Sequence, residues 1–150
     1  MKIKQNSPVK VAFFHIMAGG FSGAAKNIFR LFIHIDSKKL ETMLIGQTEN
    51  ELTVRVRKIG IKVFNIPFPP ALNVFDKKLL NLNIVDFFRT LVAVWKYNLL
   101  LVRFFKTTKS QIIWADNIRT FFSVYAASKL SGCKIIWNIW SEPKGKVAWL

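Results

Sequence analysis

The stretch from Lys10 to Ile35 reads KVAFFHIMAGGFSGAAKNIFRLFIHI, and it decides the fold. It opens within Val9–Ile16, a short apolar run rich in β-branched and aromatic residues, which predicts a buried strand. Gly19 and Gly20 interrupt the run, and a helical pattern begins near Ser22, a predicted N-cap. A strand, a glycine turn and a helix N-terminus direct free N–H groups at one point, so this stretch predicts an anion-binding cradle.

Two features of this stretch have more than one interpretation. The glycines at positions 19, 20 and 23 do not have the spacing G-x-G-x-x-G of dinucleotide-binding motifs, and the alternative is that they only allow a tight turn. His15 lies inside the predicted strand, where a histidine of the sheet core is more common than a site residue.

Composition limits the class of protein. The chain has 150 residues, enough for one domain with a sizeable core, and we expect residues 1–150 to form a single domain. Its 23 Lys and Arg residues exceed its 8 Asp and Glu residues, which favours polyanionic partners. No Cys/His set has zinc spacing, so we expect no metal and no cofactor. The polar, basic first ten residues do not form a signal peptide, which predicts a cytoplasmic protein.

Apolar runs alternate with helical patterns along the rest of the chain. Strands are expected at 41–46, 61–66, 111–115 and 134–139, and helices at 49–58, 83–106 and 120–130. Because the strands are apolar throughout, the predicted fold class is α/β, a Rossmann-like doubly wound parallel sheet in three α/β/α layers. Ligands of such sheets bind at the carboxyl ends of the strands, here residues 16–23, 116–119 and 140–142.

The pattern at 83–106 combines a broad apolar surface with a line of cations. Arg89, Lys96 and Arg103 recur every seven residues, so they lie nearly on one line of the helix. Three cations within about 20 residues are costly inside a bilayer and argue against a membrane span. We expect an amphipathic helix whose cations face an anionic membrane. The alternative is a fully buried helix with only its basic line in water.

Two segments, KVAFFHIMAGGFSGAAKNIFRLF (10–32) and IIWADNIRTFFSVYAASKLSGCKIIWNIWSEP (112–143), resemble the N-terminal half of retaining glycosyltransferases of the GT-B fold, family 4. The resemblance implies transfer of a sugar from a nucleotide-sugar to an acceptor that is often lipid-linked. It also implies that this half holds the acceptor while its glycine loop approaches the donor diphosphate. The family's glycine loop matches Gly19 and Gly20, the polar end of its fourth strand matches Asn117, and its later His or Arg-Glu position matches Trp140, Ser141 and Glu142.

The sequence departs from that family in two ways. No histidine occupies the position of Trp140–Glu142, and the second Rossmann-like domain, which binds the donor through a pair of glutamates, is not in the sequence. A truncated gene, an excised domain and one half of a two-chain enzyme are the alternatives that follow. In each of them we expect the chain to be inactive alone.

The function expected from these features is acceptor binding in a glycosyltransferase of polysaccharide biosynthesis. The acceptor is a lipid-linked or cell-surface glycan, and the protein is peripheral on the inner face of the cell membrane. The alternative is a non-enzymatic Rossmann-like module that binds a nucleotide or a partner. Nucleic-acid binding ranks last because the aromatic residues fall in predicted buried strands and helices.

Overall fold

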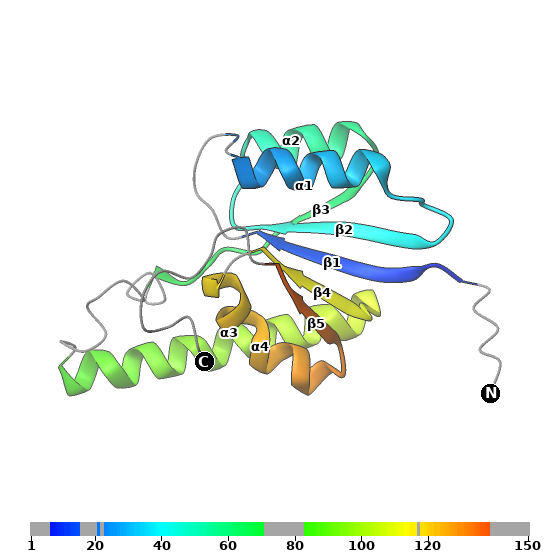
Figure 1. The fold of residues 1–150 in the computed structure, drawn as a ribbon. Coiled ribbons are helices and arrows are strands. Elements are labelled where there is room, and N and C mark those ends of the chain that lie inside the picture. The colour runs from blue at the N-terminus through cyan, green and yellow to red at the C-terminus, as the bar shows by residue number, and fades with distance from the viewer. Residues whose placement is uncertain (1–6, 16–20, 22, 71–82, 117, 139–150) are drawn as a thin grey trace, which may run out of the picture.

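A parallel sheet lies between two layers of helices (Figure 1). The computed structural model describes residues 7–15, 21, 23–70, 83–116 and 118–138. In chain order the elements are β1 (Val9–His15), α1 (Gly23–His34), β2 (Leu40–Gly46), α2 (Glu51–Lys58), β3 (Lys62–Asn65), α3 (Ile84–Thr108), β4 (Ile112–Ala115), α4 (Ile118–Ser131) and β5 (Lys134–Trp137). The strand order is β3-β2-β1-β4-β5 with parallel pairing throughout. The predicted α/β, Rossmann-like fold class is confirmed.

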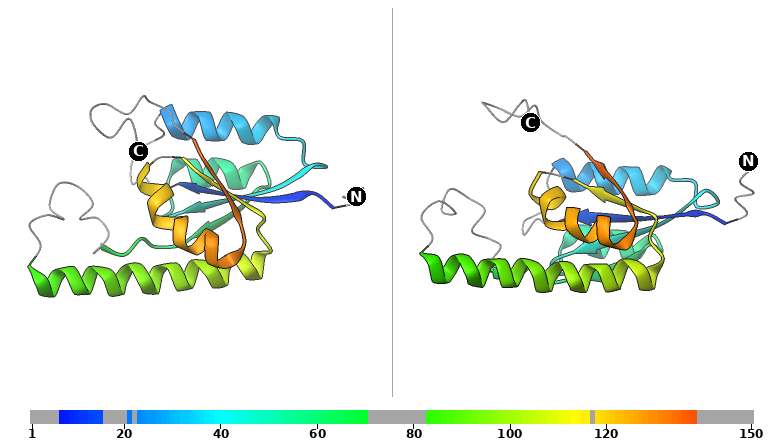
Figure 2. Two further views of the ribbon diagram at one scale, coloured as in Figure 1. Left: turned by 60° about the horizontal axis from the view of Figure 1, so that its bottom comes forward. Right: turned by 90° about the horizontal axis from the view of Figure 1, so that it is seen from below.

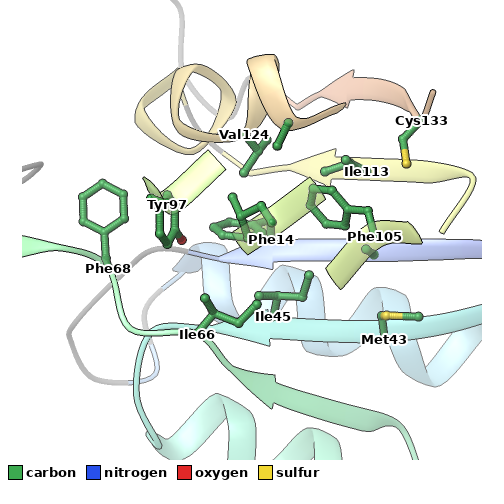
Figure 3. Packing of buried hydrophobic residues seen from close by; sticks show 13 residues of the cluster. Phe14, Met43, Ile45, Ile66, Phe68, Tyr97, Phe105, Ile113, Val124 and Cys133 are labelled. Carbon is green, nitrogen blue, oxygen red and sulfur yellow. The ribbon is translucent and has the colours of Figure 1, made fainter. Parts of the chain in front are cut away.

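The central strand β1 contributes to the core on both faces of the sheet. Val11 and Phe13 belong to the cluster beneath α1 and α2, which includes Ala25, Ile28, Phe32, Leu44, Leu52 and Val56. Ala12 and Phe14 belong to the cluster beneath α3 and α4, which is shown in Figure 3 and includes Met43, Ile45, Tyr97, Leu101, Phe105, Ile113 and Val124. Apolar residues on both faces of one strand therefore produce the continuous run by which the sequence predicts a covered parallel sheet.

Local signals set the ends of the helices. Asn50 caps α2, since its side chain accepts a hydrogen bond from the Thr53 backbone N–H at 3.0 Å while Thr53 Oγ1 accepts from the Asn50 N–H at 2.8 Å. Gly60 follows α2 with φ of +84°, a left-handed conformation that suits glycine and stops the helix at the end predicted for it, residue 58. The Asn83 side chain caps α3, so the predicted helix at 83–106 starts one residue later, and it continues to Thr108.

The largest differences from the predicted pattern concern exposure. Among the apolar residues in and next to α1 and α2, Leu31 and Ile59 are exposed, by 37% and 42%. The edge strand β5 is covered on one face only: Ile135 packs against the cluster beneath α3 and α4, whereas Ile136 is exposed. The prediction that every strand is buried on both faces is therefore wrong for this edge.

Helix α3 runs along the sheet and extends beyond it (Figures 1 and 2). It follows β3 and lies antiparallel to the strands, so its N-terminal end projects on the side where the carboxyl ends of the strands lie. The first turns of α3 therefore lie beside the edge at which doubly wound sheets bind their ligands.

Candidate functional site

The carboxyl ends of β1 and β4 meet at the point where the chain connections diverge. After β1 the chain passes to α1 on one face of the sheet, and after β4 it passes to α4 on the other face (Figure 1). Adjacent parallel strands with connections on opposite faces form a topological switch point, the usual ligand-binding position of such folds.

A buried histidine and a buried aspartate meet at this switch point. The His15 Nδ1 atom forms a hydrogen bond with Asp116 Oδ2, and the side chains are only 4% and 1% exposed. The second carboxylate oxygen, Asp116 Oδ1, accepts a hydrogen bond from Thr120 Oγ1 at 2.8 Å. The aspartate is thereby held between the end of β1 and the first turn of α4.

Strand register brings these residues together. Phe14 pairs with Ala115 in the β1–β4 ladder, so the next residues, His15 and Asp116, leave the two strands at the same level. His15 ends β1, Asp116 directly follows β4, and Thr120 lies one turn of helix beyond it. Two residues that are 101 positions apart in sequence are thus placed side by side by backbone pairing.

The sequence-predicted ligand residues lie outside the described part of the chain. This applies to the proposed phosphate cradle and to the polar strand ends, namely Gly19, Gly20, Ser22, Asn117, Trp140 and Glu142. Their assignment stays a prediction. The described residue that the sequence interpretation undervalued is His15, which pairs with a carboxylate instead of lying among apolar side chains alone.

The prediction for Asp116 was also incomplete. The sequence placed it among residues 116–119 at a strand end without assigning it a contact, whereas its side chain binds His15 across the sheet. The sequence does contain a signal for this pair, since His15 and Asp116 are each the first polar residue at the end of a buried strand. To predict their contact, one must also know that the two strands are neighbours, which the sequence does not specify.

The three predicted membrane-facing cations lie on a solvent-exposed side of α3. We define the outer face of α3 as these cations, Arg89, Lys96 and Arg103, together with Ile84, Val85, Phe88, Val92, Trp95 and Leu99. Ile84, Phe88 and Trp95 are 73%, 59% and 61% exposed. Shallow hollows on this face are lined by Val85, Phe88, Arg89 and Val92, and by Lys96, Leu99, Leu100 and Arg103.

This exposure contradicts one of the two expectations for α3, and the membrane-facing role of its cations stays a prediction. Its buried residues are Thr90, Tyr97, Asn98, Leu101 and Phe105, all on the side that faces the sheet and α4. The alternative of a fully buried helix is therefore wrong. The expectation that aromatic residues are buried is wrong here as well, because Phe88 and Trp95 are among the most exposed large side chains.

The described residues contain no helix long and apolar enough to cross a membrane. Within the same part of the chain, no three His, Cys, Asp or Glu side chains gather in a group that would hold a metal ion. His15 and Asp116 form a hydrogen-bonded pair of titratable side chains at the switch point.

Comparison with known proteins places the fold. No protein-family model matches the sequence, and no curated protein matches it significantly. A structure of MurG from Acinetobacter baumannii is similar with a TM-score of 0.59 and 10% identity over 87% of this chain. A glycosyltransferase from Rickettsia africae ESF-5 has a TM-score of 0.54 and 12% identity over 91% of this chain. The chain spans about a third of the length of these structures, 34% and 32% respectively. Its fold is that of a Rossmann-like domain of GT-B glycosyltransferases, as the sequence resemblance predicted.

Proposed function

We propose that this chain is the acceptor-binding domain of a glycosyltransferase that works at an anionic membrane surface. The observation that carries the proposal is the outer face of α3, which exposes large apolar side chains beside a line of three cations. The similarity in fold to a glycosyltransferase structure supports sugar transfer as the reaction. The acceptor is a lipid-linked or cell-surface glycan.

The outer face of α3 has the chemistry of an interfacial helix. Apolar side chains gain free energy when they enter the boundary between headgroups and acyl chains. Each Lys or Arg near an anionic surface adds about 1 kcal/mol, so Arg89, Lys96 and Arg103 together are worth about 3 kcal/mol. The formal net charge of +15 adds a long-range attraction to the same surface.

The position of α3 links membrane binding to the candidate site. Its first turns, with Ile84, Val85 and Phe88 exposed, project at the carboxyl edge of the sheet (Figure 2). His15 and Asp116 lie at that same edge. A membrane bound to the outer face of α3 would therefore present the headgroup of a lipid-linked acceptor near the switch point.

Binding of the nucleotide-sugar donor requires a further surface besides the proposed acceptor and membrane surfaces. The chain spans about a third of the structures that it resembles, so we propose that a further domain, in the same protein or in a partner chain, completes the donor site. The chain alone then binds acceptor and membrane but does not transfer sugar. The Rossmann-like module without enzymatic activity is the other candidate, and it predicts no preference for a lipid-linked acceptor.

Vesicle flotation with matched surface charge tests the proposal. One vesicle population contains phosphatidylglycerol, and in the other part of this lipid is replaced by a polyprenyl phosphate until the surface potentials agree. We expect the chain to bind both populations and to prefer the polyprenyl phosphate. Equal binding to the two populations would remove the acceptor assignment, and no binding to either would remove the membrane assignment.

A further inference from the structure

The edge strand β5 has backbone groups that no other described strand uses. The N–H groups of Lys134 and Asn138 donate to carbonyl oxygens at or next to the ends of β4, both at 2.9 Å, so the backbone groups of the even-numbered residues face β4. Because these groups alternate between the two edges of a strand, those of Ile135 and Trp137 point away from the sheet. Among the described residues β5 is the last strand of the sheet. An open edge of this kind is a template for a further strand.

Both faces of this edge are apolar. On the α3/α4 face, the Trp137 ring stacks on Phe121 with centroids 5.3 Å apart, and Ile135 packs against the core cluster. On the other face, Ile136 is 40% exposed next to Trp114, with which it is paired in the β4–β5 register. A strand edge with apolar side chains on both faces is normally covered in a finished protein.

We infer that β5 is the interface of a symmetric dimer, in which the β5 strands of two copies of this chain pair antiparallel across a two-fold axis at Ile136. In this register Ile135 of each copy exchanges backbone hydrogen bonds with Trp137 of the other copy, so the outward groups of both residues are satisfied. An axis at Ile135 would place Trp137 opposite Cys133, whose N–H is already bonded within its own chain. The register at Ile136 is therefore favoured.

The side chains that face one another in this register are compatible. Ile136 meets its own counterpart on the α1/α2 face, with about 4.5–5.5 Å between Cβ atoms as is typical of opposed residues. Ile135 meets Trp137 on the other face, and Lys134 meets Asn138, so no like charges lie directly opposite. Each chain has a formal net charge of +15, so the copies repel at longer range, and added salt screens this repulsion.

The symmetry of the pairing favours a second copy over another protein. A two-fold axis perpendicular to the sheet keeps the same face of both copies on the same side. Both α3 helices then lie on one side of a continuous sheet, and their outer faces point in the same direction. One membrane can contact both, which raises vesicle affinity above that of a monomer. This consequence rests on the proposed function, whereas the dimer itself does not.

Amide hydrogen exchange of the whole chain tests the interface without any variant. In the dimer the amides of Ile135 and Trp137 are bonded only between copies, whereas those of Lys134 and Asn138 are bonded within one copy and serve as controls. We expect exchange at Ile135 and Trp137 to slow at least about tenfold between about 5 μM and 500 μM protein, and exchange at the controls to change less than about twofold. Sedimentation equilibrium should show the mass of a dimer, and association should tighten when salt is raised.

A variant links the dimer to membrane binding. Ile136→Lys places like charges opposite each other at the axis and should return the chain to a monomer. The matched control is Ile33→Lys, because Ile33 is 53% exposed on α1 and the change in charge is the same. Vesicle binding by Ile136→Lys should be at least about 100-fold weaker than that by Ile33→Lys, through loss of bivalent contact.

A monomer at every concentration, or a dimer whose Ile135 and Trp137 amides stay unprotected, would overturn the inference. A monomer in which both amides are protected throughout would also overturn it, because another part of the same chain would then cover the edge. Exchange and sedimentation are measured without lipid. A dimer that binds no vesicles would therefore remove the membrane proposal and leave the interface, and a monomer that binds vesicles would do the reverse.

Discussion

Helices α2 and α3 cover opposite faces of the same sheet (Figure 1). The side chains on their outer surfaces differ in character. Two of the three cations of α2 are matched by acids, since Arg55 pairs with Glu51 at 2.6 Å and Arg57 with Glu49 at 3.3 Å. The outer face of α3 combines three cations, of which Arg89 pairs with Asp86 at 3.7 Å, with exposed aromatic and aliphatic side chains. The outer surface of α2 is therefore adapted to water, whereas α3 packs one side on the core and exposes apolar side chains on the other.

The largest expected effect separates the two sides of α3. Leu101 is fully buried on the side of α3 that packs on the core, whereas Leu99, two residues earlier in the same helix, is exposed. Leu101→Ala should lower the free energy of unfolding by about 2–5 kcal/mol because it leaves a cavity. Leu99→Ala should change it by less than about 0.5 kcal/mol. Urea unfolding measures both, and similar losses would mean that the outer side also packs within the protein.

The second prediction concerns the exposed aromatics of α3. Phe88→Gln and Trp95→Gln should weaken vesicle binding, by up to about 1.5–3 kcal/mol for a side chain that leaves water completely. Neither should lower the thermal stability in solution. Phe122→Gln is the matched control, since Phe122 is equally exposed but lies on α4. If Phe122→Gln weakened flotation as much as the α3 variants, vesicle binding would not be specific to α3.

The third prediction concerns the side of α3 that packs on the core, where the Tyr97 hydroxyl is buried. Tyr97 is 4% exposed, its hydroxyl makes no hydrogen bond to a described residue, and burial raises the pKa of this group. Tyr97→Phe should therefore leave stability unchanged or raise it by about 1 kcal/mol. A clear loss of stability in chemical unfolding would show that this hydroxyl has a partner.

The smallest effect belongs to an ion pair cluster at the amino ends of β1, β2 and β3. Lys62 at 3.3 Å and Lys10 at 3.4 Å hold the pKa of Glu41 below its usual value. Glu41→Gln should cost a few tenths of a kcal/mol at neutral pH, as is typical of surface pairs. A carboxyl with a lowered pKa stabilises above its unfolded pKa of about 4.3, and this benefit disappears as the pH falls through the folded pKa. The two proteins should therefore converge below pH 4 in acid unfolding.

The fold was predictable because its signals are local. Apolar runs such as Val9–Ile16 and stops such as Gly60 depend on neighbouring residues, and the strands and helices follow the predicted order with ends shifted by one or two positions. The amphipathic pattern of 83–106 likewise predicted the line of Arg89, Lys96 and Arg103, which the structure places on an exposed face.

The candidate site was only partly predictable because it depends on which strands are neighbours. The meeting of His15 and Asp116 follows from the β1–β4 pairing, a contact across 101 residues that no local pattern encodes. Exposure at the edge of the sheet, as for Ile136, depends in the same way on what covers the finished fold.

Vesicle binding by two variants of equal charge tests the central claim most directly. Arg89, Lys96 and Arg103 are changed to Gln in one variant, and Arg55, Arg57 and Lys58 in the other, so each loses three of the 23 Lys and Arg residues. We expect the α3 variant to bind vesicles of 30% phosphatidylglycerol about 100-fold more weakly than wild type, from about 1 kcal/mol per cation, and the α2 variant only a few-fold more weakly. Equal losses in the two variants would show that net charge alone drives binding and would contradict a specific membrane face on α3.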